Sequence, residues 1–326
     1  MNDAISYRIR EDGLEDREIR GICETHQLTC NNITKVVGSF EKEVFSVDDR
    51  YVIRTSRQSM HEEQIKYDRI RNMKYVPKIL HASDQRKRSS DVNYLILEYI
   101  KGSELLTSSD DLKEQDLYEI GVALGDFLFE LHSIKGESYD IGHYVPIIPG
   151  YKQSWRSGHE AYWDSIYQGL NNLDLPKDMQ QLLELSNEYI QKNVASLEFE
   201  GGPSLLHNDF HLKNIILHDR KLSGVIDWEC SQYGEADFDL IHLLHWCLFP
   251  PSEDMDWKPL FNAVFLSYRR KNRIPGIGKR LAIYMLEHDF IQILWSKGKR
   301  ADEFQARIRG WLDGSLEEYI QNLIEC

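Results

Sequence analysis

Cysteine is scarce in this chain of 326 residues, and its pattern suits no chemistry that needs several thiols. The cysteines are odd in number and scattered: Cys23, Cys30, Cys230, Cys247 and Cys326. None forms a Cys-x-x-Cys pair or stands in a Cys/His cluster, which argues against a disulfide framework and a structural zinc site. We expect reduced thiols, most of them packing residues.

Long apolar runs are also missing. No stretch approaches the length that a membrane-spanning helix needs. The N-terminal sequence MNDAISYRIREDGLED is polar and acidic, unlike a secretory signal or a transit peptide. We therefore predict a cytoplasmic protein with no membrane partner.

Basic residues are outnumbered, with 39 Lys and Arg against 53 Asp and Glu and a formal charge of −14. This balance argues against a nucleic-acid partner, which requires a basic surface to meet phosphates. It would suit a cationic small molecule, although solubility explains an acidic protein equally well. The hydrophobic content of 41% is ordinary, and the length allows a large core in two lobes.

The chain has no internal repeat, but its character changes near Gly102. Before that point, short β-branched and aromatic runs indicate strands at 33–40, 43–47, 51–56, 76–80 and 92–100, with one helix at 59–73 and a polar hairpin loop at 83–91. After it, apolar residues at helical spacing predict helices at 112–134, 158–170, 177–196, 236–248, 256–270, 277–297 and 301–324. The fold class is therefore α+β and bilobal, with a small β-rich lobe before a larger, mainly helical lobe.

One β region interrupts the helical half, in the sequence LLHNDFHLKNIILHDRKLSGVIDWEC at 205–230. NIIL and LSGVI flank a turn and predict an antiparallel hairpin. Asn214 opens the first strand and Asp227 follows the second, so both side chains can reach one point. Their oxygens suit a hard cation such as Mg²⁺. Asp209 lies five residues before Asn214, on the loop that leads into the hairpin.

This arrangement predicts phosphoryl transfer, in which one Asp accepts the proton of an attacking hydroxyl while an Asn and a second Asp hold the metal. Asp and Asn are also common in turns for purely local reasons. The joint spacing Asp-x4-Asn, followed by a hairpin and Ile-Asp, is much more specific than any one of these residues.

The same residues resemble the aminoglycoside phosphotransferase and choline kinase superfamily, which has a protein-kinase-like fold. The shared pattern is His-x-Asp-x4-Asn, a hairpin and then IDW. The resemblance implies that Asp209 is the catalytic base and that Asn214 and Asp227 bind metal. It also implies that His207 is a structural histidine of the catalytic loop. His211 and Asp239 would brace that loop.

The resemblance extends into the small lobe, where GSFEKEVFSVDDRYVIR is similar to a nucleotide-covering hairpin and the strand after it. It implies a nucleotide site made by Gly38, Ser39, Arg54, Glu63 and the main chain at Glu98 and Ile100. Glu62 is an alternative to Glu63 as the partner of Arg54. Departures from the family are HND for the commoner HGD, GEA for GDP, a single glycine in the nucleotide loop, and Arg54 where many relatives have lysine, which is not a neutral exchange.

Acceptor-binding residues are harder to predict. Carboxylates that could bind the amino groups of a polycationic sugar are Glu229, Glu235, Glu287 and Asp289, and the aromatic segment 151–165 adds Trp155. The same carboxylates could belong to solvated helix faces, and the aromatic segment could simply join helices. His242 and His245 lie three apart on one helix, without further Cys or His nearby, so packing is favoured over metal binding.

The sequence thus predicts a small-molecule kinase with a nucleotide-binding lobe at 1–97, a hinge at 98–102 and a catalytic and substrate-binding lobe at 103–326. It would use Mg²⁺ and transfer the γ-phosphate of ATP or GTP to a hydroxyl of a cationic acceptor, with an aminoglycoside antibiotic as the first candidate. Alternatives are a kinase of a macrolide, of choline or ethanolamine, or of a homoserine-like metabolite. A catalytically idle nucleotide-binding scaffold remains open as well.

Overall fold

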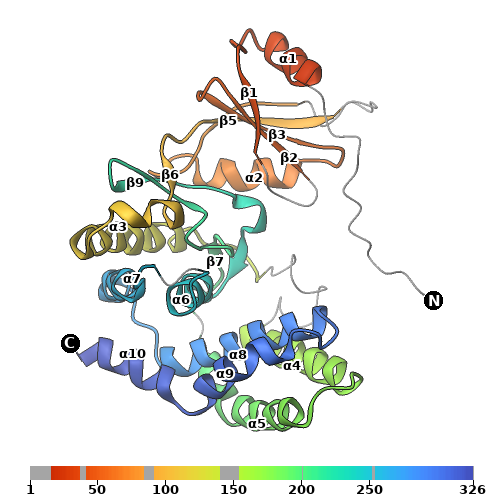
Figure 1. The fold of residues 1–326 in the computed structure, drawn as a ribbon, viewed down its shortest axis with the longest axis vertical. Helices are drawn as coiled ribbons and strands as arrows, with labels where there is room; N and C mark the ends of the chain where they lie inside the picture. The colour runs from red at the N-terminus through yellow and green to blue at the C-terminus, as the bar shows by residue number, and fades with distance from the viewer. Residues whose placement is uncertain are drawn as a thin grey trace. The chain divides into compact units, whose positions relative to one another are not determined.

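The computed structural model describes residues 16–36, 42–83, 92–139, 154–199, 201–251 and 254–325. The chain divides into two compact units, residues 1–101 and 102–326 (Figure 1). Gly38 and Ser39 lie outside the described residues, as do most of the expected loop at 83–91 and residues 151–153 of the aromatic segment.

The first unit is built on a five-stranded antiparallel sheet with strand order β1-β2-β3-β5-β4. The strands are β1 (Ile33–Val36), β2 (Glu43–Val47), β3 (Tyr51–Ser56), β4 (Ile79–Ala82) and β5 (Asn93–Glu98), and the helices are α1 (Asp16–Thr25) and α2 (His61–Ile70). The β-branched and aromatic runs of the sequence therefore form the predicted strands, and α2 is the predicted helix between them.

Helix α1 was not predicted. It has only ten residues, of which Ile19 and Cys23 are buried, so its apolar period is too short to distinguish it from a loop. Both side chains join a hydrophobic cluster with Phe45, Ile53 and Ile96 of the sheet. Burial against the sheet therefore stabilises a helix that local sequence alone does not specify.

The second unit is mostly helical, as predicted (Figure 1). Its α-helices are α3 (Glu114–His132), α4 (Trp155–Asn171), α5 (Lys177–Asn193), α6 (Leu240–Leu248), α7 (Lys258–Lys271), α8 (Ile277–Trp295), α9 (Ala301–Leu312) and α10 (Ser315–Glu325). The helix expected at 301–324 is two helices, because Gly314 adopts φ of 85° between α9 and α10. Glycine enters this left-handed region without steric cost and ends a helix there.

Small residues bring α3 and α7 together. A Cβ added at Gly121 would lie 2.5 Å from the Cβ of Ala263, and one at Gly125 would lie 2.6 Å from the carbonyl oxygen of Val264. Glycine at both positions of α3 therefore allows the two helix backbones to approach closely. This packing fixes the end of α3, which carries His132.

The predicted hairpin is confirmed: β8 (Ile215–His218) pairs antiparallel with β9 (Lys221–Val225). Three further short strands were not predicted, namely β6 (Ser103–Glu104), which pairs with β8, and β7 (Ser204–Leu206) and β10 (Gln232–Gly234), which pair with each other. Strands of two or three residues are too short to show an alternating pattern. Within the described residues, no helix has the length and apolar character needed to cross a lipid bilayer.

Candidate active site

The loop between β7 and β8 begins with His207, which is fully buried. Its Nε2–H donates to the carbonyl oxygen of Ile226 at 2.8 Å, and its Nδ1 accepts the backbone N–H of Asp209 at 3.3 Å. The contact with Ile226 requires a proton on Nε2. The ring also packs on Trp228, at 4.6 Å between ring centroids. His207 therefore connects the loop to the end of the β8–β9 hairpin.

Asp239 lies beneath the start of this loop and has no exposed surface. Its carboxylate accepts the backbone N–H groups of His207 at 2.8 Å and Asn208 at 2.6 Å, together with His132 Nε2 at 3.1 Å. Burial alone would raise the pKa of Asp239, but the hydrogen bond and charge of His132 and the contacts with His207 outweigh it and lower the pKa. An ionised Asp239 thus fixes the backbone on which Asp209 stands.

Asn208 is the middle residue of the sequence HND, where the resemblance leads us to expect glycine. Its φ is 62°, in the left-handed region that Asn tolerates better than most residues. The side chain is 1% exposed, and neither atom of its amide has a hydrogen-bond partner among the described residues. This backbone conformation explains why glycine suits the position, and a buried amide without partners has an energetic cost.

Asp209 is held at both carboxylate oxygens. Asn214 Nδ2 donates to Oδ2 at 3.1 Å and to the backbone oxygen of Asp209 at 2.9 Å, while His211 Nε2 lies 3.4 Å from Oδ1. Burial would raise the pKa of Asp209, but the hydrogen bond and charge of His211, with His242 and His207 beyond it, lower the pKa to about 2. The carboxylate is therefore ionised at neutral pH and able to accept a proton.

His211 is positioned from two sides. Its Nδ1 accepts the N–H of Lys213 at 3.3 Å, which places the imidazole proton on Nε2, toward Asp209. Its ring stacks on that of Trp246, with centroids 4.6 Å apart and planes inclined by 24°. The bracing that the resemblance implies for His211 thus has a physical basis in α6, which carries Trp246.

Asn214 and Asp227 lie at the same end of the hairpin. The carbonyl oxygen of Asn214 accepts the N–H of Ile226 at 2.9 Å, and Asp227 is the next residue, with φ of 65°. Because Asn214 Nδ2 faces Asp209, its Oδ1 is the side-chain atom that can meet a cation. An amide oxygen and a carboxylate are hard oxygen donors that fit Mg²⁺.

In the first unit, the buried carboxylate of Glu63 on α2 contacts two cations. Arg54 Nε of β3 lies 2.9 Å from Oε1, and Lys42 Nζ lies 2.7 Å from Oε2. The partner of Arg54 is therefore Glu63 and not Glu62, which is exposed. Sequence reasoning missed Lys42, since only the register of β2 and β3 brings it near Arg54.

The hinge residues were expected to offer main-chain groups to a nucleobase. Glu98 ends β5, and its N–H donates to the carbonyl oxygen of Lys78 at 2.9 Å. This N–H is therefore already hydrogen-bonded within the protein. If Glu98 contacts a nucleobase through its main chain, its carbonyl oxygen is the group that does so. Ile100 follows the strand and is half-buried.

The structure contradicts part of the predicted acceptor surface. Trp155 is fully buried, and its Nε1–H donates to the hydroxyl of Tyr284 at 2.7 Å. Glu235 is 2% exposed; it accepts the hydroxyl of Tyr139 and the N–H of Gly201, the latter at 3.0 Å. Both side chains belong to the core of the second unit, where they meet protein groups and not solvent.

The two predicted carboxylates of α8 are also in the core. Glu287 is 2% exposed, and its Oε2 lies 2.7 Å from His159 Nδ1. Asp289 is fully buried and accepts Trp311 Nε1–H at 2.8 Å. The prediction of an acceptor-binding role is therefore wrong for the carboxylates Glu235, Glu287 and Asp289, and for the aromatic Trp155. Glu229, which is half-buried, is the remaining member of that set.

A histidine cluster adjoins Asp289. His245, His288 and Asp289 have ligand atoms within 4.8 Å of one another, a spacing that could hold a metal ion. Arg307, however, donates from Nη1 to His245 Nε2 at 2.5 Å, and its Nη2 lies 3.7 Å from Asp289 Oδ1. The positively charged guanidinium group of Arg307 thus lies where a metal ion would bind. This contact favours packing over metal binding at His245.

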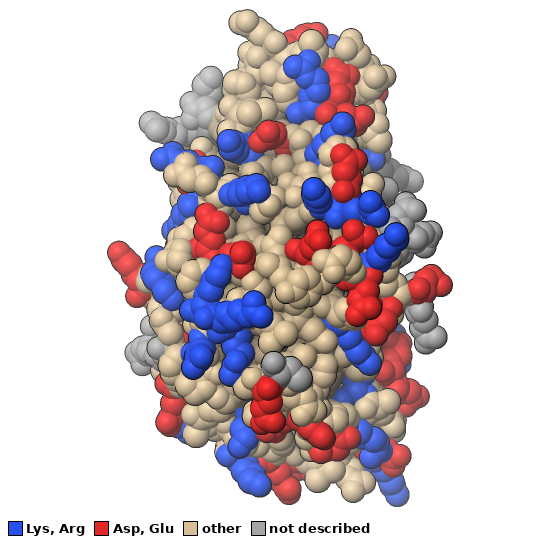
Figure 2. Space-filling view, turned by 90° about the vertical axis from the view of Figure 1, so that its left-hand side faces the viewer, with Lys and Arg blue, Asp and Glu red and all other residues tan. Residues whose placement is uncertain are grey.

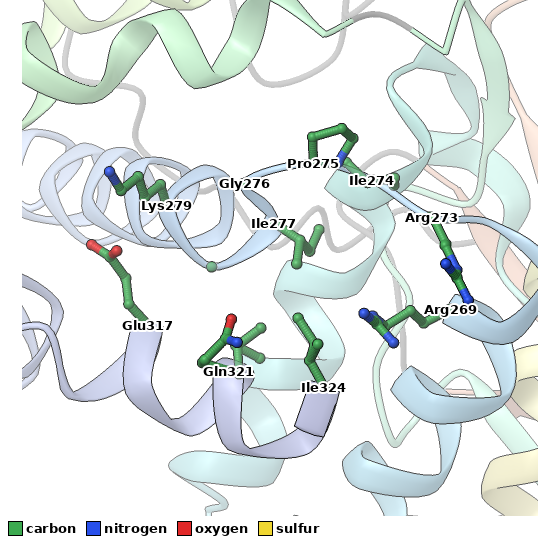
Figure 3. Close-up of a pocket in the computed structure, with 12 residues that line it drawn as sticks. Arg269, Arg273, Ile274, Pro275, Gly276, Ile277, Lys279, Glu317, Gln321 and Ile324 are labelled. Atoms are coloured by element: carbon green, nitrogen blue, oxygen red, sulfur yellow. The ribbon is translucent and has the colours of Figure 1, made fainter. Parts of the chain in front are cut away.

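A cavity of about 460 Å³ lies elsewhere in the second unit, at the start of α8 (Figure 3). Arg269 and Arg273 line one side, and Glu317 of α10 lies near Lys279 on the other. None of the predicted site residues lines it. The cavity is therefore not part of the predicted phosphoryl-transfer site.

Comparison with known sequences identifies the family of the chain. Residues 32–259 match the sequence profile of the phosphotransferase enzyme family (APH), which is more than half of the chain. The chain belongs to this family. The matched range contains the loop at 207–214 and the β8–β9 hairpin described above.

Solved structures share the fold. A streptomycin–ATP ternary complex of APH(2")-IIa is 19% identical, covers 91% of this chain and 96% of its own, and has a TM-score of 0.62. APH(4)-Ia is 16% identical, with 93% and 99% covered and a TM-score of 0.62. Among curated proteins, acyl-CoA dehydrogenase family member 11 of Pongo abelii is 29% identical over 217 residues, which are 64% of this chain and 25% of that protein. The chain thus spans about a quarter of the length of this relative.

Proposed function

We propose that this member of the phosphotransferase family transfers the γ-phosphate of ATP or GTP to a hydroxyl of a small molecule. The observation that carries the proposal is the arrangement around Asp209. An ionised carboxylate is held by Asn214 and His211, on a backbone that Asp239 fixes. A carboxylate so placed can accept the proton of an acceptor hydroxyl as its oxygen attacks phosphorus.

Mg²⁺ bound by Asn214 and Asp227 would neutralise charge on the nucleotide phosphates. Within the chain, Asn214 has two roles. Its Nδ2 orients Asp209 and its Oδ1 is left for the metal, so the base and the metal site are set by one side chain. In the first unit, a cation held by Glu63 would bind the phosphates, and the main chain at Glu98 and Ile100 would meet the nucleobase. Segment 98–102 would serve as the hinge.

An aminoglycoside is the first acceptor to test, because the solved structures with this fold include complexes with such compounds. The burial of Glu235, Glu287 and Asp289 removes the acidic surface that supported this choice from sequence. On the face drawn in Figure 2, acidic and basic side chains both occur, and no single acidic surface covers it. A neutral hydroxyl compound is therefore an equal candidate.

The function is tested by coupled detection of nucleoside diphosphate with Mg²⁺ and ATP or GTP. The acceptor panel contains aminoglycosides, a macrolide, choline, ethanolamine and homoserine. We expect one class of acceptor to stimulate release, with transfer confirmed by mass spectrometry of the phosphorylated product. If the protein binds nucleotide but transfers phosphate to no acceptor, even when the panel is extended to further alcohols, the result would favour a catalytically idle nucleotide-binding scaffold.

Asp227→Asn tests the metal site. We expect this substitution to weaken the Mg²⁺ dependence of nucleotide affinity, because one anionic ligand of the hard cation is replaced by a neutral one. The measurement is calorimetric titration of ATP at several Mg²⁺ concentrations. Asp219→Asn is the matched control, since Asp219 lies in the turn of the same hairpin and its side chain is 88% exposed. An unchanged Mg²⁺ dependence in Asp227→Asn would remove this residue from the metal site.

A further inference from the structure

Two basic side chains of the first unit compete for the role of phosphate-binding cation. Sequence resemblance assigns that role to Arg54, which stands on β3 where many relatives have lysine. The structure adds Lys42, which immediately precedes β2. Each contacts a different oxygen of Glu63, at 2.9 Å from Arg54 Nε and 2.7 Å from Lys42 Nζ.

The register of the sheet explains why the two cations converge. Val44 of β2 lies opposite Arg54 of β3, so their side chains share one face. Lys42 stands two residues before Val44, and side chains two apart along a strand point to the same face. Glu63 reaches that face from α2. A lysine on β2 and an arginine on β3 thus reach one carboxylate.

Burial distinguishes the two cations. The side chain of Arg54 is 7% exposed and that of Glu63 is 4% exposed, whereas that of Lys42 is 20% exposed. A nucleotide arrives from solvent, so its phosphates meet the more exposed cation. An ammonium group has three N–H donors and a flexible stem, so one donor can hold Glu63 while the others bind phosphate oxygens.

We propose that Lys42, and not Arg54, is the cation that binds the phosphates of the nucleotide. Arg54 is a positioning residue that holds Glu63, and Glu63 in turn orients the Lys42 ammonium group. The assignment rests on the proposed function in one respect, namely that the first unit binds a nucleoside triphosphate. It moves the phosphate contact from β3 to the start of β2.

The test compares Lys42→Met with the wild-type full chain by calorimetric titration of MgATP, or of MgGTP if the wild type prefers it, and of the matching nucleoside. We expect affinity for the triphosphate to fall about 10- to 100-fold, as for a lost charge-assisted hydrogen bond. Affinity for the nucleoside should not change, because it has no phosphate. Lys42→Arg should restore part of the triphosphate affinity.

Lys35→Met is the matched control, since Lys35 is an exposed lysine of β1 that pairs with Glu43; its triphosphate affinity should equal that of the wild type. Arg54→Met should lower the melting temperature and weaken nucleoside and triphosphate binding together, because α2 loses an anchor. A selective loss of triphosphate affinity in Arg54→Met, with none in Lys42→Met, would overturn the assignment. An equal loss for nucleoside and triphosphate in Lys42→Met would also overturn it.

No acceptor enters these titrations. A wild type that binds the triphosphate but transfers it to no acceptor therefore contradicts the proposed function while leaving the assignment of Lys42 intact. A wild type that binds neither triphosphate would overturn both.

Discussion

Asp209→Asn should lower turnover roughly 10²- to 10⁴-fold, the range expected when a positioned general base is removed. The amide keeps the shape of the side chain and can still accept a hydrogen bond from Asn214, but it cannot take the proton of an attacking hydroxyl. The pKa of Asp209 is lowered to about 2, so the wild-type carboxylate is ionised throughout the neutral range. The measurement is kcat with the acceptor found by the panel.

Nucleotide affinity separates this effect from misfolding. Asp209→Asn should bind MgATP as the wild type does, because the substitution leaves the first unit untouched. Asp219→Asn, in the exposed hairpin turn, should retain full turnover. Full turnover in Asp209→Asn itself would show that another group accepts the proton, and the assignment of the base would then be wrong.

Asp239→Ala should destabilise the second unit by about 3–5 kcal/mol, the cost typical of removing one partner from a buried charged pair. The loss is large because three donors depend on this carboxylate: the N–H groups of His207 and Asn208, and His132 Nε2. Each would be left in the interior without its acceptor. Chemical denaturation monitored by circular dichroism measures the change.

Asp126→Ala is the matched control. Its carboxylate also contacts a hydroxyl and a lysine, Ser267 and Lys271, but its side chain is 51% exposed. Exposed pairs contribute only about 0–1 kcal/mol, so this variant should be nearly as stable as the wild type. Equal stability of Asp239→Ala and Asp126→Ala would contradict the role given to Asp239.

The contribution of Asp239 to the stability of the fold should also depend on pH. The pKa of Asp239 is lower in the folded chain than in the unfolded chain, so its contribution to stability is complete above the unfolded value of about 3.9. The contribution is lost as the pH falls below that value toward the folded pKa. The stability difference between the wild type and Asp239→Asn should therefore shrink in acid. A difference that stays constant from neutral pH to pH ~3 would contradict this linkage.

The arrangement of the loop that carries Asp209 could be predicted because its contacts are local in sequence. Asp209 and Asn214 are five residues apart, and a short hairpin brings Asp227 beside them whatever the rest of the fold does. The Glu63–Arg54 pair was predicted only to within one residue. A helix presents Glu62 and Glu63 to different faces, and only packing of α2 on the sheet decides which face is buried.

The prediction of the acceptor surface was wrong because the contacts of its residues are distant in sequence. Glu287 lies on a helix that is buried on nearly every side, and its partner His159 is 128 residues away. A carboxylate that binds a ligand and one that pairs with a distant histidine look alike in sequence. Lys42 was missed for a related reason, because its meeting with Glu63 depends on strand register and on the docking of α2.

The sequence by itself determined the family, the α+β fold class, the hairpin and the spacing of Asp209, Asn214 and Asp227, since each depends on spacing over a few residues or on periodicity within one element. Tertiary structure alone decided which carboxylates reach solvent, which glutamate contacts Arg54 and which lysine contacts the same glutamate. Those outcomes depend on side chains far apart in the chain, which the free energy of burial brings together only when the whole unit folds.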